Sequence, residues 1–422
     1  MRRKLMYSEK WPPWVIFKDS MTKRLPIELA SLLLLVAVTR SVTHAANLPD
    51  LTETQANSMR YIVCTGSPQQ TPKTPVKPRP EVAAKPVPTP TPTRQFGHIS
   101  LNVSRIVEVA LDNRSTGRIT VVGWDRDVIS ARAVSQRGEE ALILTQSTDG
   151  PEQRVFLKAD YADLESSDHA GRALDMPPIG DDGPIQIHLE VSLPRSATIE
   201  LIRVTRSNVE ISNVETPLTI VGDKSSVILK HVGPVEVHTR SGSIEIEDAK
   251  GLVALSTSSG AIRVLHARSG VQAVSIAGPI EVRCALGRVD VTNTNAPIDL
   301  YNVDGDVSAI AANSSVRFAS ELQEDGRYYL RSMSGRVEMI LAANTPGFNA
   351  SLSSYRGIVE SDFPLKTIQL NANKKINRDG EKEIMRRLNG KFGKGGPQIM
   401  LDSFEGFVRL TRTTRPEPTT CK

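Results

Sequence analysis

Cysteine and aromatic residues are scarce in this chain. It has only three cysteines in 422 residues, at Cys64, Cys284 and Cys421, and aromatic residues make up 5% of it. Three scattered cysteines are too few for a cysteine-based zinc site or a disulfide framework. Because hydrophobic residues nevertheless make up 39% of the chain, we expect a core built from Val, Ile, Leu and Ala. Of the three tryptophans, only Trp124 lies beyond the first 45 residues.

The chain also lacks an excess of charge outside its first segment. Eight of the 52 basic and three of the 47 acidic residues lie in residues 1–45, so the remainder carries 44 of each sign. The pI of about 9.0 therefore reflects the first segment. It is no evidence for binding to nucleic acid, which we exclude as a partner.

No apolar run is long enough to cross a membrane as a helix. The run from Leu29 to Thr39 is short beside the roughly 20 residues that a span requires, but it fits the h-region of a signal peptide. Lys23 and Arg24 precede it, and cleavage before Ala46 would leave small residues at the site. We therefore expect residues 1–45 to be a signal peptide, with Met21 as an alternative start. An uncleaved N-terminal anchor is the other interpretation.

The cysteines allow two expectations. Cys284 continues the apolar alternation of Ile280 and Val282, so we expect it to be a small buried core residue. Cys64 and Cys421 lie in the flanks and could pair in an oxidising compartment, but the sequence does not set the distance between them.

Residues 46–95 are predicted to form a disordered linker rich in Pro and Thr. Within it, the 28 residues 67–94 have no apolar face and favour polyproline II, which would reach about 90 Å. Such a segment is either a spacer that holds the folded part away from a surface or a tail without consequence.

Strands are predicted to begin after Phe96. Residues 117–125 and 128–131 form a strand–turn–strand pattern, and 159–183 form an irregular acidic loop. Strict alternation from Ile185 to Leu193 predicts a half-buried strand. Residues 96–200 thus form the N-terminal strands of the domain.

The strongest pattern is a repeat that recurs every nine residues. Apolar pairs separated by one residue start at Val209, Leu218, Val227, Val235, Ile244, Val253, Ile262, Val271, Ile280, Val289, Ile298, Val307 and Val316. One step has eight residues, and Gly or Pro precedes many of the pairs. Short strands with turns at fixed offsets predict stacked coils, because no single repeat can bury its apolar face alone. We place regular β-solenoid repeats in residues 201–365.

The predicted coil has two short strands and about 18 residues, because one series of turn residues recurs every 18 residues, in only one of the two half-repeats. One half-repeat has small or polar residues at one turn position: Ser241, Ser259, Ala277, Asn295 and Asn313. The other half-repeat offers no comparable series. Outward positions of the same register carry Glu245, Arg263, Glu281, Asp299 and Arg317. In a parallel stack these residues lie about 4.8 Å apart and form a ladder of mostly alternating charge.

Residues 366–412 are predicted to hold a basic insertion and closing strands, and 413–422 a disordered tail. Glu381 to Leu388 is expected to be a short helix. The insertion contains Lys374, Lys375, Arg378, Lys382, Arg386, Arg387, Lys391 and Lys394. It is either a solvated insertion, which we favour, or a contact for anionic headgroups or acidic polymer. A further interpretation is that the insertion pairs with the acidic loop, residues 159–183.

Three segments resemble a bacterial family of adhesin-like β-strand-repeat domains of unknown function. They are residues 119–125, the Gly-x-Ile-x-Val ladder, and the closing pair 396–399 and 406–410. The resemblance covers about residues 100–411 and implies an all-β parallel β-helix or β-solenoid in exported or membrane-linked proteins. It implies no catalytic residues.

Catalytic and metal chemistry has weak support in the sequence. Glu281 and Asp299 would be neighbouring carboxylates, as a carbohydrate-active β-helix enzyme needs, but flanking arginines give them a place in the charge ladder. Residues 302–306 form an acidic turn with Asp304 and Asp306, which we interpret as solvated rather than as a Ca²⁺ site. His231 and His238 have no third ligand in register. We assign no catalytic, cofactor-binding or metal-binding residues and no cofactor.

The sequence thus predicts a non-enzymatic, exported, envelope-associated binding or scaffold protein. Its location would be periplasmic, cell-surface or extracellular, or at the membrane if the leader is retained. Its partner would be an envelope polymer or protein; the sequence names neither that partner nor the oligomeric state. The alternatives are a polysaccharide lyase or hydrolase on a β-helix and a structural envelope-regulatory component.

Overall fold

The computed structural model describes residues 91–104, 107–149, 152–164, 179–369, 374–376, 382–384, 386–414 and 421. The predicted leader, Cys64 and nearly all of the predicted linker lie outside these residues. The chain divides into two compact units, residues 1–85 and 86–422, and the second contains everything described below. The described residues are all-β. Among them, no helix has the length and hydropathy that a membrane span requires.

The strands fall into three groups. The N-terminal group is β1 (Thr93–Phe96), β2 (Ile99–Asn102), β3 (Val107–Asn113), β4 (Arg118–Trp124), β5 (Val128–Ser135), β6 (Gly138–Asp149), β7 (Glu152–Ala159), β8 (Ile179–Gly180), β9 (Gly183–Pro184), β10 (His188–Pro194) and β11 (Thr198–Val204). The repeat group is β12 (Asn208–Ser212), β13 (Leu218–Lys224), β14 (Val227–Lys230), β15 (Val235–Ser241), β16 (Ile244–Ile246), β17 (Val253–Ser259), β18 (Ile262–Val264), β19 (Val271–Ser275), β20 (Ile280–Arg283), β21 (Val289–Asn293), β22 (Ile298–Tyr301), β23 (Val307–Ala311) and β24 (Val316–Ala319). The C-terminal group is β25 (Arg327–Ser332), β26 (Val337–Ala342), β27 (Gly347–Ser354), β28 (Val359–Ser361), β29 (Lys366–Gln369), β30 (Lys374–Ile376), β31 (Lys382–Ile384), β32 (Arg386–Gly393), β33 (Gln398–Ser403) and β34 (Val408–Thr413).

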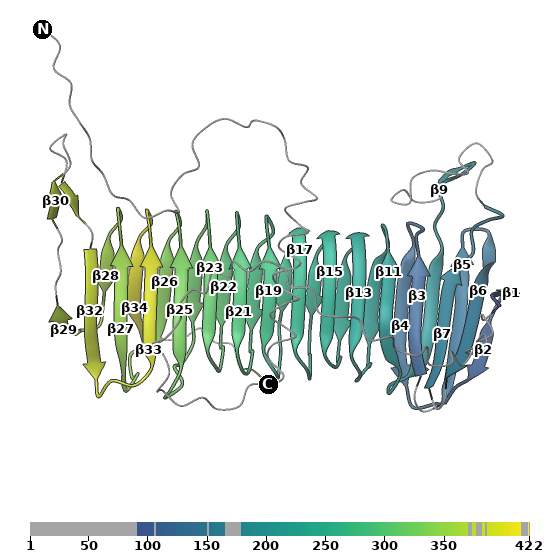
Figure 1. Cartoon of the computed structure of the whole chain (residues 1–422), viewed down its shortest axis with the longest axis horizontal. Coiled ribbons are helices and arrows are strands. Elements are labelled where there is room, and N and C mark those ends of the chain that lie inside the picture. Colours follow the sequence, from purple (N-terminus) through teal and green to yellow (C-terminus); the bar gives the residue numbers. More distant parts are fainter. Residues whose placement is uncertain are drawn as a thin grey trace, which may run out of the picture. The chain divides into compact units, whose positions relative to one another are not determined.

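Each strand of the repeat group pairs in parallel with the second strand after it, so odd- and even-numbered strands form two columns (Figure 1). Ile280 lies beside Ile298, and Val289 lies beside Val307. The pairing in this region therefore has the two-strand offset that the repeat predicts. The eight-residue step shortens the offset between β13 and β15, where Leu218 pairs with Val235.

The core lies between the two columns. Val, Ile, Leu and Ala fill it, as the composition predicts, and Ile280, Val282 and Val289 are fully buried. Each coil closes its apolar face only against the coils on either side, so the stack is solenoid-like and its stability depends on neighbouring coils.

The turn that joins an odd to an even strand combines predicted and unpredicted polar contacts. The predicted column is in register, and Asn313 Nδ2 donates to Asn295 Oδ1 at 2.8 Å. A second, buried column lies just before it: Thr239, Thr257, Ser275 and Asn293. The sequence interpretation missed this column because its members sit where the apolar alternation places core residues.

Near the C-terminal end the same turn becomes a Ser-x-x-Gly unit. The backbone N–H of Gly406 donates to Ser403 Oγ at 2.8 Å, and that hydroxyl donates to the carbonyl oxygen of Gly335 at 3.1 Å. Ser354 makes the equivalent contact to the carbonyl oxygen of Gly406 at 2.8 Å. Each buried serine therefore satisfies its own turn and links it to the next coil.

Antiparallel strands complete the N-terminal end. Strand β10 pairs in parallel with β4 and antiparallel with β5, and its alternating residues Leu189, Val191 and Leu193 are buried as predicted. Strand β1 pairs antiparallel with β6, from Thr93 beside Leu144. The strands therefore begin earlier than predicted, because residues 93–95, placed in the linker by their composition, already belong to a ladder.

The C-terminal end departs most from the sequence interpretation. Strand β33 lies between β25 and β27, and β34 lies between β26 and β28, so the last coil in sequence is inserted between the coil of β25 and β26 and the coil of β27 and β28. The predicted helix from Glu381 to Leu388 is wrong: β31 and β32 occupy this region, and β32 pairs antiparallel with β27. Pairing with the open edge of β27 outweighs the local helical preference.

Candidate functional site

The predicted charge ladder is present and continues further than expected. Glu245, Arg263, Glu281, Asp299 and Arg317 lie on neighbouring strands in that order. Glu338 and Arg409 extend the ladder. Arg263 Nε lies 3.4 Å from Glu281 Oε2, and Arg283 also contacts Glu281. Glu281, one of the two carboxylates considered for catalysis, therefore contacts two guanidinium groups.

The acidic turn and the histidines are also tied to neighbours. Arg327 Nη2 lies 2.7 Å from Asp306 Oδ2, and its hydrogen bonds lower the pKa of Asp306. His231 Nδ1 lies 3.3 Å from Asp248 Oδ2, whereas His238 Nε2 lies 2.8 Å from Glu236 Oε1. The structure thus does not bring the two histidines into one site. Within the described residues, no group of three or more His, Cys, Asp or Glu side chains is arranged to hold a metal.

The acidic loop makes its visible contacts elsewhere than expected. Within its described part, Asp160 and Asp163 contact Arg94. Pairing with the basic insertion is not seen among the described residues of these two segments.

The turn after the even-numbered strands contains a column of aligned turn residues, although no such column was predicted for this half-repeat. Bridges between Val232, Ala249, Ala267 and Ala285 fix its register. The residues immediately before these alanines and valine line up along the stack, in the order His231, Asp248, His266 and Cys284, and Asn302 continues the series one coil later. His231, Cys284 and Asn302 adopt positive φ values of 52°, 55° and 50°.

Left-handed backbone explains why this series was missed. At such a residue the inward–outward alternation of the strand breaks, so the side chain leaves the core register. Alternation from Ile280 and Val282 therefore misplaced Cys284. The available signal was the recurrence of Asn213, His231, Cys284 and Asn302 at the coil spacing, because Asn and His are enriched at positive φ.

Cys284 forms a disulfide with Cys421, with their Cα atoms 5.5 Å apart. The predicted burial of Cys284 is confirmed, since the residue is 8% exposed, but it is bonded to a second cysteine and is not only a packing residue. The proposed Cys64–Cys421 pair is also wrong, because Cys421 is already bonded across 137 residues of sequence.

A groove of about 950 Å³ follows this turn across successive coils. Its wall includes His231, Glu247, Asp248, His266, Arg268, Leu286, Asp304 and Glu321, together with both bonded cysteines. Four carboxylates and one arginine make the lining acidic. Leu286 adds an exposed apolar surface, at 48% exposure.

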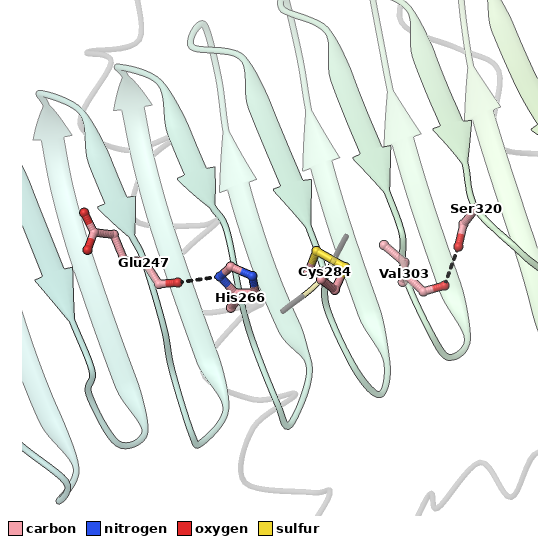
Figure 2. The surroundings of a disulfide bond; sticks show 6 residues. Glu247, His266, Cys284, Val303 and Ser320 are labelled. Atoms are coloured by element: carbon pink, nitrogen blue, oxygen red, sulfur yellow. Dashed lines mark hydrogen bonds between the residues drawn. A yellow bond between two sulfur atoms is a disulfide. The ribbon is translucent and has the colours of Figure 1, made fainter. Parts of the chain in front are cut away.

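Hydrogen bonds fix the groove wall (Figure 2). His266 Nδ1 lies 3.0 Å from the carbonyl oxygen of Glu247, and Ser320 Oγ donates to the carbonyl oxygen of Val303 at 2.9 Å. Arg268 Nη2 lies 3.3 Å from Asp248 Oδ2. Side chains that are held by the neighbouring coil in this way present a preformed surface to an extended ligand.

Comparison with known proteins gives structural neighbours only. No protein-family model matches the chain, and no curated protein is significantly similar to it. A candidate cell adhesion protein from Clostridium sporogenes aligns over 76% of this chain and all of its own, with 7% identity and a TM-score of 0.19. A candidate lipid binding protein and a candidate adhesin from Parabacteroides distasonis align over 76% and 75% of this chain and 96% and 97% of their own, both with 9% identity and with TM-scores of 0.33 and 0.29. Similarity at this level assigns no function.

Proposed function

We propose that this chain is a non-enzymatic, exported and envelope-associated binding protein, an adhesin-like parallel β-solenoid presented on a proline-rich stalk. The observation that carries the proposal is the groove, which crosses successive coils in register. Its walls repeat at the spacing of the strands, about 4.8 Å, so that an extended ligand meets polar groups at each step. Such a surface binds an extended ligand through many weak contacts along one line.

The ligand that fits best is an extended polypeptide segment with basic side chains. Two observations favour it over a polyanion: the lining carries four carboxylates against one arginine, and the groove already holds Cys421 from the chain's own C-terminus. Complementary charge speeds encounter and fixes register more than it adds affinity.

Capture from envelope extracts tests the binding role. We expect the intact protein to retain a protein partner and to lose it at high salt, because the distance over which exposed charges interact falls from about 8 Å at physiological ionic strength to about 3 Å in 1 M salt. Asp304→Asn and Leu286→Ser, both in the groove, should weaken capture. Val221→Ser, at an exposed strand position outside the groove lining, is the matched control.

The same preparation separates this proposal from a carbohydrate-active enzyme. Incubation with neutral and uronic-acid polymers, with and without Ca²⁺, should give no turnover. Turnover that Asp299→Ala abolishes would favour the enzyme, whereas binding of a glycan without turnover would favour a polymer ligand.

The leader, stalk and location form a separate part of the proposal. N-terminal sequencing of the exported protein should give a start at Ala46. An intact leader would instead make it a membrane-anchored protein, and recovery only from the cytoplasm would contradict export.

A further inference from the structure

We propose that the Cys284–Cys421 disulfide is a thiol-exchange site: an external thiol attacks Cys421, and Cys284 leaves as a thiolate beside His266. This goes beyond the binding role, because it assigns covalent chemistry to a bond inside the groove. It does not depend on the identity of any binding partner.

The two bonded residues differ in exposure. Cys284 is 8% exposed at a turn of the stack, whereas Cys421 is an exposed residue. Exchange requires the attacking thiolate to approach one sulfur while the other leaves. Attack is therefore directed at Cys421, and Cys284 is the leaving group.

His266 is placed to assist that departure. Its Nδ1 lies 3.0 Å from the Glu247 carbonyl oxygen, which can only accept, so Nδ1 carries a proton and Nε2 of the neutral ring is free of one. Figure 2 shows the second ring nitrogen on the side of the ring that faces the coil of Cys284. Since neighbouring coils lie about 4.8 Å apart, a protonated Nε2 can interact with the departing sulfur.

The reaction balances with a dithiol as the reductant. The first thiol loses its proton, which passes to His266 Nε2, and its sulfur bonds to Cys421 as the Cys284–Cys421 bond breaks. The Cys284 thiolate keeps the electron pair and then takes the proton from His266. The second thiol of the reductant displaces Cys421 as a thiol, so that the reductant ends as a disulfide and the protein gains two thiols.

The groove also selects the charge of the incoming thiol. Glu247, Asp248, Asp304 and Glu321 outnumber Arg268 around the bond. An anionic thiolate reagent is repelled by this lining, and a cationic one is attracted. The class of substrate is therefore a cationic or neutral thiol, including a cysteine flanked by basic residues.

Timed reduction of the intact, folded protein tests the proposal. Samples in dithiothreitol are quenched with iodoacetamide, and peptide masses report the labelling of Cys284 and Cys421 separately from Cys64. We expect His266→Gln to slow reduction by about tenfold, in the range of the effect of a histidine on a neighbouring thiol. His238→Gln, at a histidine that lies outside the groove lining and contacts Glu236, should react like the unmodified protein.

Further measurements keep the test independent of folding. Circular dichroism and the urea midpoint of each oxidised variant establish that it is folded. In Cys421→Ser, the free Cys284 thiol should react with an aromatic disulfide more slowly when His266→Gln is added. Cysteamine should reduce the bond faster than mercaptoethanesulfonate, relative to their rates on a small-molecule disulfide, and salt should narrow the difference.

Three results would overturn the proposal. One is equal reduction rates for the unmodified protein and His266→Gln. Another is a bond that resists dithiothreitol until urea unfolds the chain. The third is a preference for the anionic thiol that persists at low salt.

Discussion

Replacement of Gly278 by alanine should be among the most destabilising single-methyl additions in the stack. A Cβ atom at this position would lie 1.6 Å from the carbonyl oxygen of Gly260 and 2.2 Å from its carbonyl carbon. Backbone atoms cannot rotate away as a side chain can. Gly278 does not have a positive φ, so the contact rather than the backbone conformation excludes a side chain.

The magnitude follows from the opening that the methyl group requires. To bring the new Cβ to about 3.2 Å from the Gly260 carbonyl oxygen, the two coils must separate by about 1.6 Å, roughly a third of the 4.8 Å between them. Overpacking of this kind costs about 1–3 kcal/mol. The bond from the Ile262 N–H to the Pro279 carbonyl oxygen, 2.9 Å long, lies next to the clash. Losing one or two such bonds adds about 1 kcal/mol each, which gives a total of about 3 kcal/mol.

Urea unfolding followed by circular dichroism measures this loss. Gly222→Ala is the matched control, because the three atoms nearest to its Cβ would be side-chain atoms, at 3.1 Å or beyond, and its φ is also not positive. We expect the control to change the free energy of unfolding by less than about 1 kcal/mol. Hydrogen exchange at the amides of Ile262 and Ile280 should rise only in Gly278→Ala. Equal effects of the two substitutions would refute the argument from close backbone approach.

Three other substitutions test the packing and charge arguments. Ser403→Ala should cost about 1–3 kcal/mol in urea unfolding, because it removes a buried hydroxyl and leaves the partly buried N–H of Gly406 without its acceptor. An unchanged midpoint would contradict the role of the serine turn. Phe348→Ala removes a fully buried ring that packs on two other aromatic rings, and should cost about 3–5 kcal/mol; calorimetry would show a smaller loss if the C-terminal coils unfold separately. Because Arg327 lowers the pKa of Asp306, this pair stabilises the fold above the unfolded pKa of the carboxyl, about 3.9, and loses that effect as the pH falls through the lower folded value. Arg327→Gln should thus cost less than about 1 kcal/mol at neutral pH, since the pair is partly exposed, and the difference should vanish in acid.

Much of the repeat region could be predicted from residues alone. The apolar pairs mark every strand from Val209 to Val316, because a parallel stack buries the same two positions in each short strand. The ladder from Glu245 to Arg317 followed from the same register. These features depend only on spacing along the chain, which the sequence states directly.

The candidate site could be predicted far less well. Cys284 was misplaced because alternation assumes extended backbone, whereas its φ of 55° turns the side chain out of the strand register. The helix expected from Glu381 to Leu388 is a strand because β27 offers it an open edge. Neither the turn geometry nor the free edge can be read from local composition.

The sequence by itself determined the coil length, the two strand columns, the aliphatic core and the charge ladder, since each is a periodic property of the chain. The tertiary structure alone decided which distant segments meet. It inserted β33 and β34 between earlier strands, aligned His231, His266 and Cys284 along one groove, and joined the buried Cys284 to Cys421. The physical reason is that periodicity fixes neighbours one coil away, whereas contacts between segments far apart in the sequence depend on how the two ends of the stack are closed.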